Sequence, residues 1–185
     1  MRLRQVRIPQ VSHAPGVTQE HKAADAAPGG TIRLVRHACG APGLRWFGLG
    51  PDLRPIRALR KLQILLDRHS FWASGRSLAD LRRKLSGSTV VVSAWQGKRL
   101  VGFGRACSDG IFRAVLWDVV VVSDLQGRGI GRRLVEALLQ DPALCRAERV
   151  YLMTTYSDRF YRQLGFRSAD SQQLLVRHRR QARGG

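Results

Sequence analysis

Residues 119–132 read VVVVSDLQGRGIGR, a run of four valines that passes through three alternating glycines into a helix-like stretch. β-branched residues favour a strand, and the glycines that follow it allow a tight turn. A turn of this kind exposes successive backbone N–H groups, and a helix that begins near Gly131 adds its positive dipole end to them. The stretch therefore predicts a cradle for an anion such as a pyrophosphate.

The spacing of the glycines excludes two common phosphate-binding loops. The dinucleotide fingerprint requires a third glycine where Arg132 stands. A Walker A loop requires Gly-Lys-Ser/Thr at the helix start, and the sequence there continues Arg132-Arg133-Leu134. A different class of pyrophosphate ligand is indicated.

A second motif lies about one strand and one helix downstream. Residues 149–153, RVYLM, predict a strand, and residues 157–166, SDRFYRQLGF, predict a short helix. Ser157 is the expected N-cap, Phe160 and Leu164 share one face, and Gly165 can end the helix in a left-handed conformation. Tyr161 is then rotated away from the face of Phe160.

The two motifs together resemble a known family. QGRGIG (126–131) resembles motif A of the GCN5-related N-acetyltransferases (GNAT), and FYRQLGF (160–166) resembles the signature that ends their core. The resemblance covers roughly residues 31–178, and LWDVVV (116–121) with RACSDG (105–110) looks like the plastid-type branch, which also occurs in photosynthetic bacteria. It implies acetyl-CoA as co-substrate, contacted by Val119, Val120, Val121, Gln126, Gly127, Arg128, Gly129, Ile130, Gly131, Arg132, Thr154, Thr155 and Tyr156. Many members carry an asparagine where residues 154–156 read TTY, so backbone contacts alone are expected there.

The resemblance also suggests how protons would be handled. Tyr161 is the candidate general acid, because the family places this tyrosine near the thiol of coenzyme A and a phenol stays protonated at neutral pH. Asp118 is the candidate general base; alternatively, its side chain, on the opposite side from Val119, holds a loop. Weaker candidates are Tyr156, Asp109 and His69, and a water chain without a dedicated base is a further alternative.

Hydrophobic periodicity predicts a single α/β domain with a mixed sheet and helices on both faces. Residues 1–30 read as a loose extension and a poor transit peptide, residues 31–178 as the acetyltransferase domain, and residues 179–185 as a basic tail. Residues 38–55 read as a Gly/Pro-rich loop, and Asp109-Gly110 as a hairpin turn. Strands are expected near 31–37, 89–95, 99–107, 111–122, 149–154 and 171–178, and helices over 56–66, 77–85 and from Gly131 to about 141.

Bulk composition narrows the partners and the compartment. A formal net charge of +19 implies an anionic partner, and a generally positive surface that attracts the cofactor is favoured over nucleic-acid or ribosome docking because the basic residues are not interleaved with aromatics. Three widely separated cysteines argue against a disulfide framework and favour a reducing compartment: the cytoplasm, or the plastid stroma in a eukaryote. Neither a metal site nor a membrane span is expected.

These observations predict an acetyl-CoA-dependent N-acetyltransferase that acts on a primary amine, most simply a protein lysine or an N-terminus. One alternative is a small-amine acetyltransferase for serotonin-like arylalkylamines or polyamines. The other is a non-catalytic, basic acyl-CoA-binding module associated with ribosomes or nucleic acid. The loop that carries His69, Phe71, Trp72 and Arg76 is a candidate specificity surface, and the oligomeric state is left open.

Overall fold

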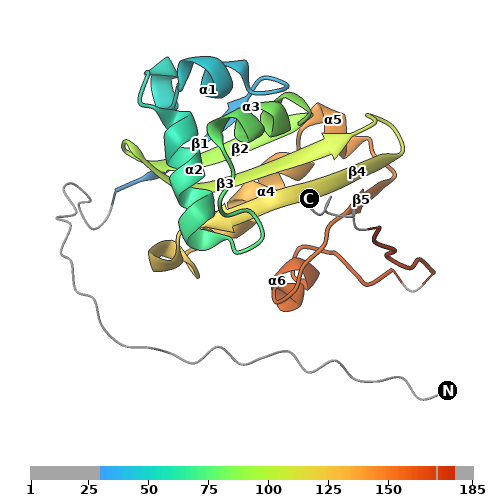
Figure 1. Ribbon diagram of the computed structural model, residues 1–185. Helices are drawn as coiled ribbons and strands as arrows, with labels where there is room; N and C mark the ends of the chain where they lie inside the picture. Colours follow the sequence, from blue (N-terminus) through green and yellow to red (C-terminus); the bar gives the residue numbers. More distant parts are fainter. Residues whose placement is uncertain (1–29, 170, 178–185) are drawn as a thin grey trace, which may run out of the picture.

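The computed structural model describes residues 30–169 and 171–177 (Figure 1). These residues form one five-stranded sheet in the order β1-β2-β3-β4-β5, antiparallel throughout except for the parallel pair β4–β5. The expected mixed sheet is therefore confirmed. The strands are β1 (Ile32–His37), β2 (Val90–Gln96), β3 (Arg99–Ser108), β4 (Arg113–Val121) and β5 (Arg149–Tyr151). The helices are α1 (Pro42–Phe47), α2 (Ala58–His69), α3 (Leu78–Ser86), α4 (Ile130–Leu139), α5 (Pro142–Cys145) and α6 (Asp158–Arg162), with 3-10 turns at Pro51–Leu53 and Ser123–Leu125.

Helices cover both faces of the sheet, as the sequence predicts. Figure 1 shows α2 and α3 in front of the sheet and α4 behind it. α4 lies close to β3 because two glycines leave room for it: a Cβ on Gly102 would stand 2.9 Å from a methyl of Leu134, and one on Gly104 would stand 3.0 Å from a methyl of Leu138. A side chain at either glycine would push α4, and the turn that precedes it, away from the sheet.

A β-bulge interrupts β4 at residues 118–119. Phe103 of β3 faces Val120 and Arg105 faces Trp117, so one extra residue of β4 is inserted between the two pairs. Asp118 within the bulge has a φ of 52°, in the left-handed region, which costs a residue with a side chain about 1–2 kcal/mol. The ion pairs of its carboxylate, described below, hold Asp118 in this conformation.

Pairing between β4 and β5 is confined to three residues. Residues 113–115 pair in parallel with residues 149–151, and beyond them the described residues record no ladder between the two strands. The second half of β4 therefore keeps one backbone edge without a strand partner.

Several sequence expectations were wrong in detail. The stretch 38–55 contains α1 and a 3-10 turn rather than only loop, and the strand expected over 149–154 ends at Tyr151. Ser157 makes no side-chain cap for α6, although Gly165 does take the expected left-handed conformation with a φ of 87°. Residues 171–177 form no strand; some of them border an open cavity of about 610 Å³ beyond β5. The N-terminal extension up to residue 29, residue 178 and the tail 179–185 lie outside the described residues.

A largely buried polar group in the sheet couples stability to pH. His37 Nε2 lies 2.8 Å from the Ser93 hydroxyl, which also accepts the indole N–H of Trp95 at 2.7 Å. Burial of the imidazole lowers the pKa of His37 from 6.5 to about 4.

Among the residues that the structure describes, none of the helices has the length and apolar character that a membrane span requires.

Acidification is expected to destabilise the fold through His37. Between pH 6.5 and about 4 the unfolded chain binds a proton at this imidazole and the folded chain does not, so the stability contributed above pH 6.5 is lost as the pH falls, by up to about 3 kcal/mol. Urea unfolding at pH 7 and pH 4.5 measures this loss. His37→Gln keeps an acceptor for Ser93 but cannot titrate; a loss of equal size in that variant would assign the effect to other groups.

Candidate active site

The glycine turn after β4 is open above its backbone. Gly127 and Gly129 have φ values of 76° and 77°, which residues with side chains rarely adopt. A Cβ built on either glycine would meet no protein atom within 4 Å. Backbone conformation, rather than a neighbouring side chain, therefore explains these two glycines, and the space in front of them is available to a ligand.

The backbone N–H groups of this turn have no protein acceptor. Within the described residues, none of the six N–H groups from Gly127 to Arg132 donates a hydrogen bond to the protein, and the first bond of α4 runs from the N–H of Arg133 to Gly129 O at 3.1 Å. α4 also has no side-chain cap at Gly129. Unsatisfied donors at a helix N-terminus are a ready site for a phosphate or pyrophosphate.

The unpaired edge of β4 leads directly to this turn. The N–H of Val122 donates to Val101 O of β3 at 3.0 Å, so the backbone groups of Val121 point to the opposite edge, where β5 has diverged. Gln126 closes the end of that edge, because its amide donates to Val121 O at 3.2 Å. The valines that the sequence assigns to the cofactor therefore lie on a strand with free backbone groups, whereas the Gln126 side chain is occupied by the protein.

The two sequence motifs meet at Gly131. An ideal Cβ on Gly131 would stand 3.3 Å from the ring of Phe160 in α6 and 3.8 Å from Val121. Gly131 is therefore required for close packing of α6 on α4, a different reason from the backbone exposure expected from the sequence. The contact brings the α6 motif beside the anion cradle.

Tyr161 is held in place by two aromatic neighbours. Its ring centroid lies 4.9 Å from that of Phe160 and 5.8 Å from that of Phe166, both with edge-to-face geometry. Burial raises the pKa of Tyr161 above its usual value of 10, so the phenol stays protonated over the physiological range. A protonated phenol on the helix that packs against the cradle can act as a proton donor.

The segment 154–156 is only loosely associated with this site. All three residues are exposed, Tyr156 to 87%, and the Thr154 hydroxyl accepts the N–H of Ser157 at 3.0 Å. Their side chains make no recorded bond to the glycine turn within the described residues.

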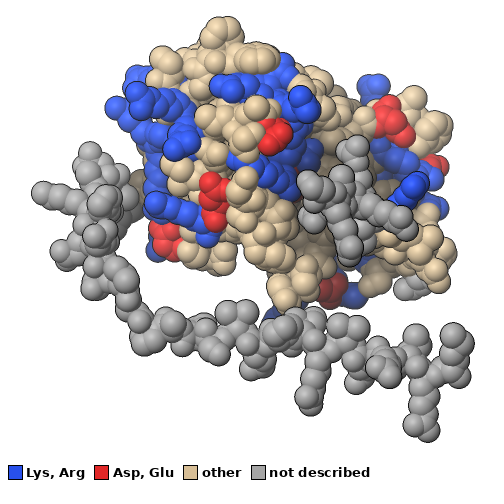
Figure 2. Space-filling view, in the orientation of Figure 1, with Lys and Arg blue, Asp and Glu red and all other residues tan. Residues whose placement is uncertain are grey.

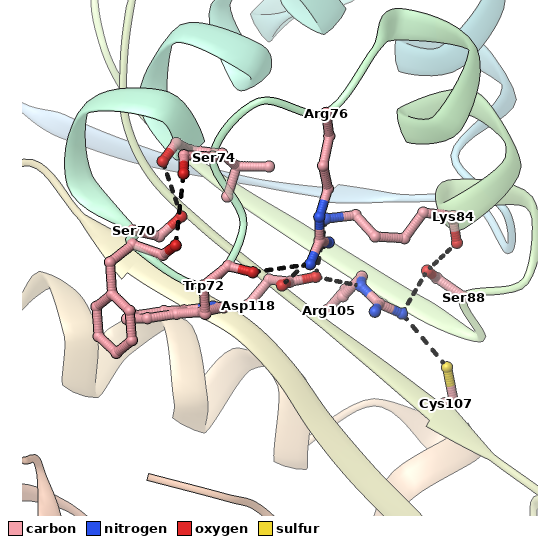
Figure 3. A network of polar contacts seen from close by, with 11 residues as sticks. Ser70, Trp72, Ser74, Arg76, Lys84, Ser88, Arg105, Cys107 and Asp118 are labelled. Carbon is pink, nitrogen blue, oxygen red and sulfur yellow. Dashed lines mark hydrogen bonds and ion pairs between the residues drawn. The ribbon is translucent and has the colours of Figure 1, made fainter. Parts of the chain in front are cut away.

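Asp118 lies in a network of basic side chains that sequence reasoning missed (Figure 3). Its carboxylate receives a 2.6 Å hydrogen bond from Arg105 Nε of β3 and lies 3.0 Å from Lys84 Nζ of α3. Arg76, in the loop before α3, approaches it to 4.0 Å. The three cations come from separate elements and share no spacing in the sequence, so nothing in the linear pattern could have grouped them.

These contacts make Asp118 a poor proton acceptor. Burial raises the pKa of the Asp118 carboxyl, but the charge of Lys84 and the hydrogen bond from Arg105 outweigh burial and hold the pKa below its usual range. The other candidate bases are also engaged. Asp109 accepts the N–H groups of residues 111, 112 and 113, and His69 Nδ1 lies 3.4 Å from the N–H of Ser123.

Comparison with known proteins identifies the family. The model described as "Acetyltransferase (GNAT) family" matches residues 59–166, more than half of the chain, and the match includes β4, the glycine turn and α6. The chain belongs to the GNAT family. Members of this family use acetyl-CoA as co-substrate, and the open turn with its six free N–H groups fits the pyrophosphate of that molecule.

The curated relatives of this GNAT chain include chloroplastic members, as its sequence indicates. It is 42% identical over 94 residues to "Serotonin N-acetyltransferase 2, chloroplastic" of Oryza sativa subsp. japonica, a match that covers 46% of each protein. It is 37% identical over 116 residues to "Histone acetyltransferase TAP1" of Glycine max, which covers 60% of this chain and 46% of the relative. The chain thus spans about half the length of the curated relatives it matches.

Solved structures support the fold. A protein from Xanthomonas campestris that is described as belonging to the GNAT family superposes with a TM-score of 0.61 at 24% identity, covering 80% of this chain and 93% of that protein. At this level of identity the likeness shows a shared GNAT fold.

Two arginines beside the GNAT turn should make smaller contributions to acetyl-CoA affinity than the backbone does. Arg128→Ala and Arg132→Ala are each expected to weaken binding about three- to tenfold, because an exposed cation only supplements the amides. The effect should be smaller for Arg132, which lies 3.5 Å from Glu136. Calorimetric titration at low and high salt measures both effects, with Arg146→Ala, distant from the turn, as control. A loss that does not shrink as salt rises would contradict the electrostatic explanation.

Proposed function

We propose that this protein transfers the acetyl group of acetyl-CoA to a primary amine, most simply a protein lysine or an N-terminal amine. The observation that carries the proposal is the set of six backbone N–H groups from Gly127 to Arg132 that have no acceptor within the described residues, in a turn that follows the free edge of β4 and leads into α4. α6, which carries the partly buried Tyr161, packs against this turn through the contact of Phe160 with Gly131.

Acetyl transfer requires a neutral amine, a hydrogen-bond donor for the developing oxyanion and a proton for the departing thiolate. The neutral amine attacks the thioester carbonyl carbon, and the negative charge that develops on the carbonyl oxygen needs a donor. The backbone N–H group of Val121, on the free edge of β4, is suited to this role. The carbon–sulfur bond then breaks, and Tyr161 would donate its phenolic proton to the departing thiolate.

Deprotonation of the amine is the least specialised step. The paired carboxylate of Asp118 would gain a proton only with difficulty, which supports the loop-holding alternative for this residue. We assign Asp118 to positioning Arg76 and α3 beside β4, and loss of the amine proton to solvent water.

The second candidate acceptor is a small arylalkylamine. It is favoured by the name of the rice relative and by two half-exposed tryptophans, which could stack on an aryl group: Trp117, at 36% exposure, precedes Asp118, and Trp72, at 49%, accepts a backbone hydrogen bond from Arg76. The name of the soybean relative favours a protein acceptor instead. The remaining alternative is a non-catalytic basic module, and the net charge of +19 is the only observation that supports it.

A thiol-release assay separates these candidates. Acetyl-CoA is supplied with lysine peptides, peptides with a free N-terminus, serotonin or polyamines, and the free thiol of coenzyme A is measured. Faster release with peptides supports the proposal, and faster release with serotonin supports the second candidate. No release with any amine would leave the non-catalytic module.

The "chloroplastic" names of relatives favour the plastid stroma as compartment, which imaging of a tagged full-length chain can test.

A further inference from the structure

The polar network at the β4 bulge carries an excess of positive charge. Arg76, Lys84 and Arg105 surround one carboxylate, and among the described residues Asp118 is the only acidic group within 4.0 Å of any of them. The network therefore has a formal charge of +2. Lys84 Nζ is buried with Asp118 Oδ2 at 3.0 Å, and burial lowers the pKa of Lys84 despite this carboxylate. A second anionic group in this place would be stabilised.

Arg76 is the member of the network that can receive such a group. Arg105 is held at 2.6 Å by Asp118, and its side chain and that of Lys84 are each only 12% exposed. The Arg76 side chain is 36% exposed, its distance to Asp118 is 4.0 Å, and its one recorded hydrogen bond goes to Trp72 O at 3.0 Å. Figure 3 shows its guanidinium between Trp72 and Asp118, and a guanidinium has five N–H donors, of which one hydrogen bond uses a single one.

The network lies next to the part of β4 where the acceptor amine is expected to react. Asp118 is the residue immediately before the strand edge of Val119 to Val121, and its side chain points toward α3, away from α4. The Arg105 guanidinium lies 5.7 Å from the half-exposed ring of Trp117, and Arg76 donates to the backbone oxygen of Trp72. On the face that carries α1, α2 and α3, Lys and Arg side chains outnumber acidic ones (Figure 2).

We propose that Arg76 selects acceptors in which a carboxylate lies close to the reacting amine, that is, acidic peptide segments. The assignment of the amine to this side of β4 rests on the proposed function; the anion site itself rests on the charge imbalance and on the exposure of Arg76. A guanidinium can bind a carboxylate through two parallel hydrogen bonds, which a neutral amide cannot reproduce.

A binding experiment tests the proposal without requiring turnover. Two octapeptides with free N-termini and a C-terminal fluorophore differ only at positions two and three, which are Glu in one and Gln in the other. Fluorescence anisotropy with the full chain is expected to give about tenfold tighter binding of the Glu peptide. Arg76→Gln should reduce this preference to less than about threefold, and Arg76→Lys should restore part of it.

The matched control is Arg83→Gln, which removes the same charge from the exposed side of α3, one residue from Lys84. It should leave the preference for the Glu peptide intact. Equal binding of the two peptides to wild-type protein, or no binding of either, overturns the proposal. So does a preference that Arg83→Gln reduces as strongly as Arg76→Gln, because the effect would then be one of overall charge.

Transfer assays with the same peptides separate this inference from the proposed function. If acetyl transfer occurs, kcat/KM should follow the binding preference and Arg76→Gln should lower it for the Glu peptide alone. A retained binding preference without transfer to either peptide contradicts the proposed function but not the anion site. A single-stranded RNA oligonucleotide that binds more tightly than the Glu peptide, and does so equally in both arginine variants, would instead indicate a diffuse polyanion surface and overturn the selection of acidic peptides.

Discussion

Tyr161→Phe is expected to lower kcat by about a hundred- to ten-thousandfold, while the KM for acetyl-CoA changes little. The substitution removes one hydroxyl and keeps the ring that packs between Phe160 and Phe166, so α6 should remain folded against α4. Loss of the proton donor leaves the thiolate to depart unassisted. Steady-state kinetics with the preferred amine, together with thermal unfolding of the variant, measures both parts of the expectation.

The pH profile provides a second readout for the same role. Because burial raises the pKa of Tyr161 above 10, the wild-type rate should decline only in strongly alkaline solution, and this alkaline limb should be absent in Tyr161→Phe. Tyr151→Phe, on β5, serves as control and should retain activity. Wild-type kcat in Tyr161→Phe would exclude the acid role. If Asp118→Asn then lost activity without unfolding, proton transfer would have to be assigned to the β4 side of the site.

Gly129→Val is expected to weaken acetyl-CoA binding by at least about a hundredfold. A side chain at this position enters the open space above the turn, where Gly129 has no protein atom within 4 Å, and it opposes the left-handed φ of 77°. Two or more charge-assisted bonds from the free N–H groups would be lost, each worth about 1.5–3 kcal/mol. Isothermal titration of the folded variant with acetyl-CoA measures the change.

Gly97→Val is the matched control for strain. Gly97, in the turn between β2 and β3, also has a positive φ and no neighbour within 4 Å, but it lies outside the cradle. Both valine variants should lose stability to a similar degree, and only Gly129→Val should lose affinity. Unchanged affinity in a folded Gly129→Val protein would remove the glycine turn from the binding site.

The sequence predicted the elements whose patterns are local. β2, β3 and β4 alternate or run apolar over enough residues to be recognised, and the Asp109-Gly110 turn is stabilised by the N–H groups that Asp109 accepts. The segment that contains α1 was missed because its proline and glycines indicate a loop. Its helix is bounded by left-handed residues at Ala41 and Gly48 that tertiary packing holds in place.

The sequence predicted the parts of the candidate site that are formed by local backbone motifs. The glycine turn and α6 are each formed by one continuous stretch of sequence, so the resemblance of each to a GNAT motif could be recognised, and the family followed from the two. The contact of Phe160 with Gly131 and the ring of cations around Asp118 arise from packing between distant elements. The bulge that turns Asp118 toward α3 depends on the register with β3, which no local pattern encodes.

The packing of Phe160 on Gly131 also bears on the order of events at the site. α6 has only five residues, too few to be stable as an isolated helix, so its folding depends on contacts such as this one with the first turn of α4. A ligand that tightens the first turn of α4 therefore also stabilises α6, and by thermodynamic reciprocity an ordered α6 retains that ligand more firmly. The phenol would then be most firmly in place when the thioester is bound, a coupling that suits a sequential mechanism in which the cofactor binds before the amine.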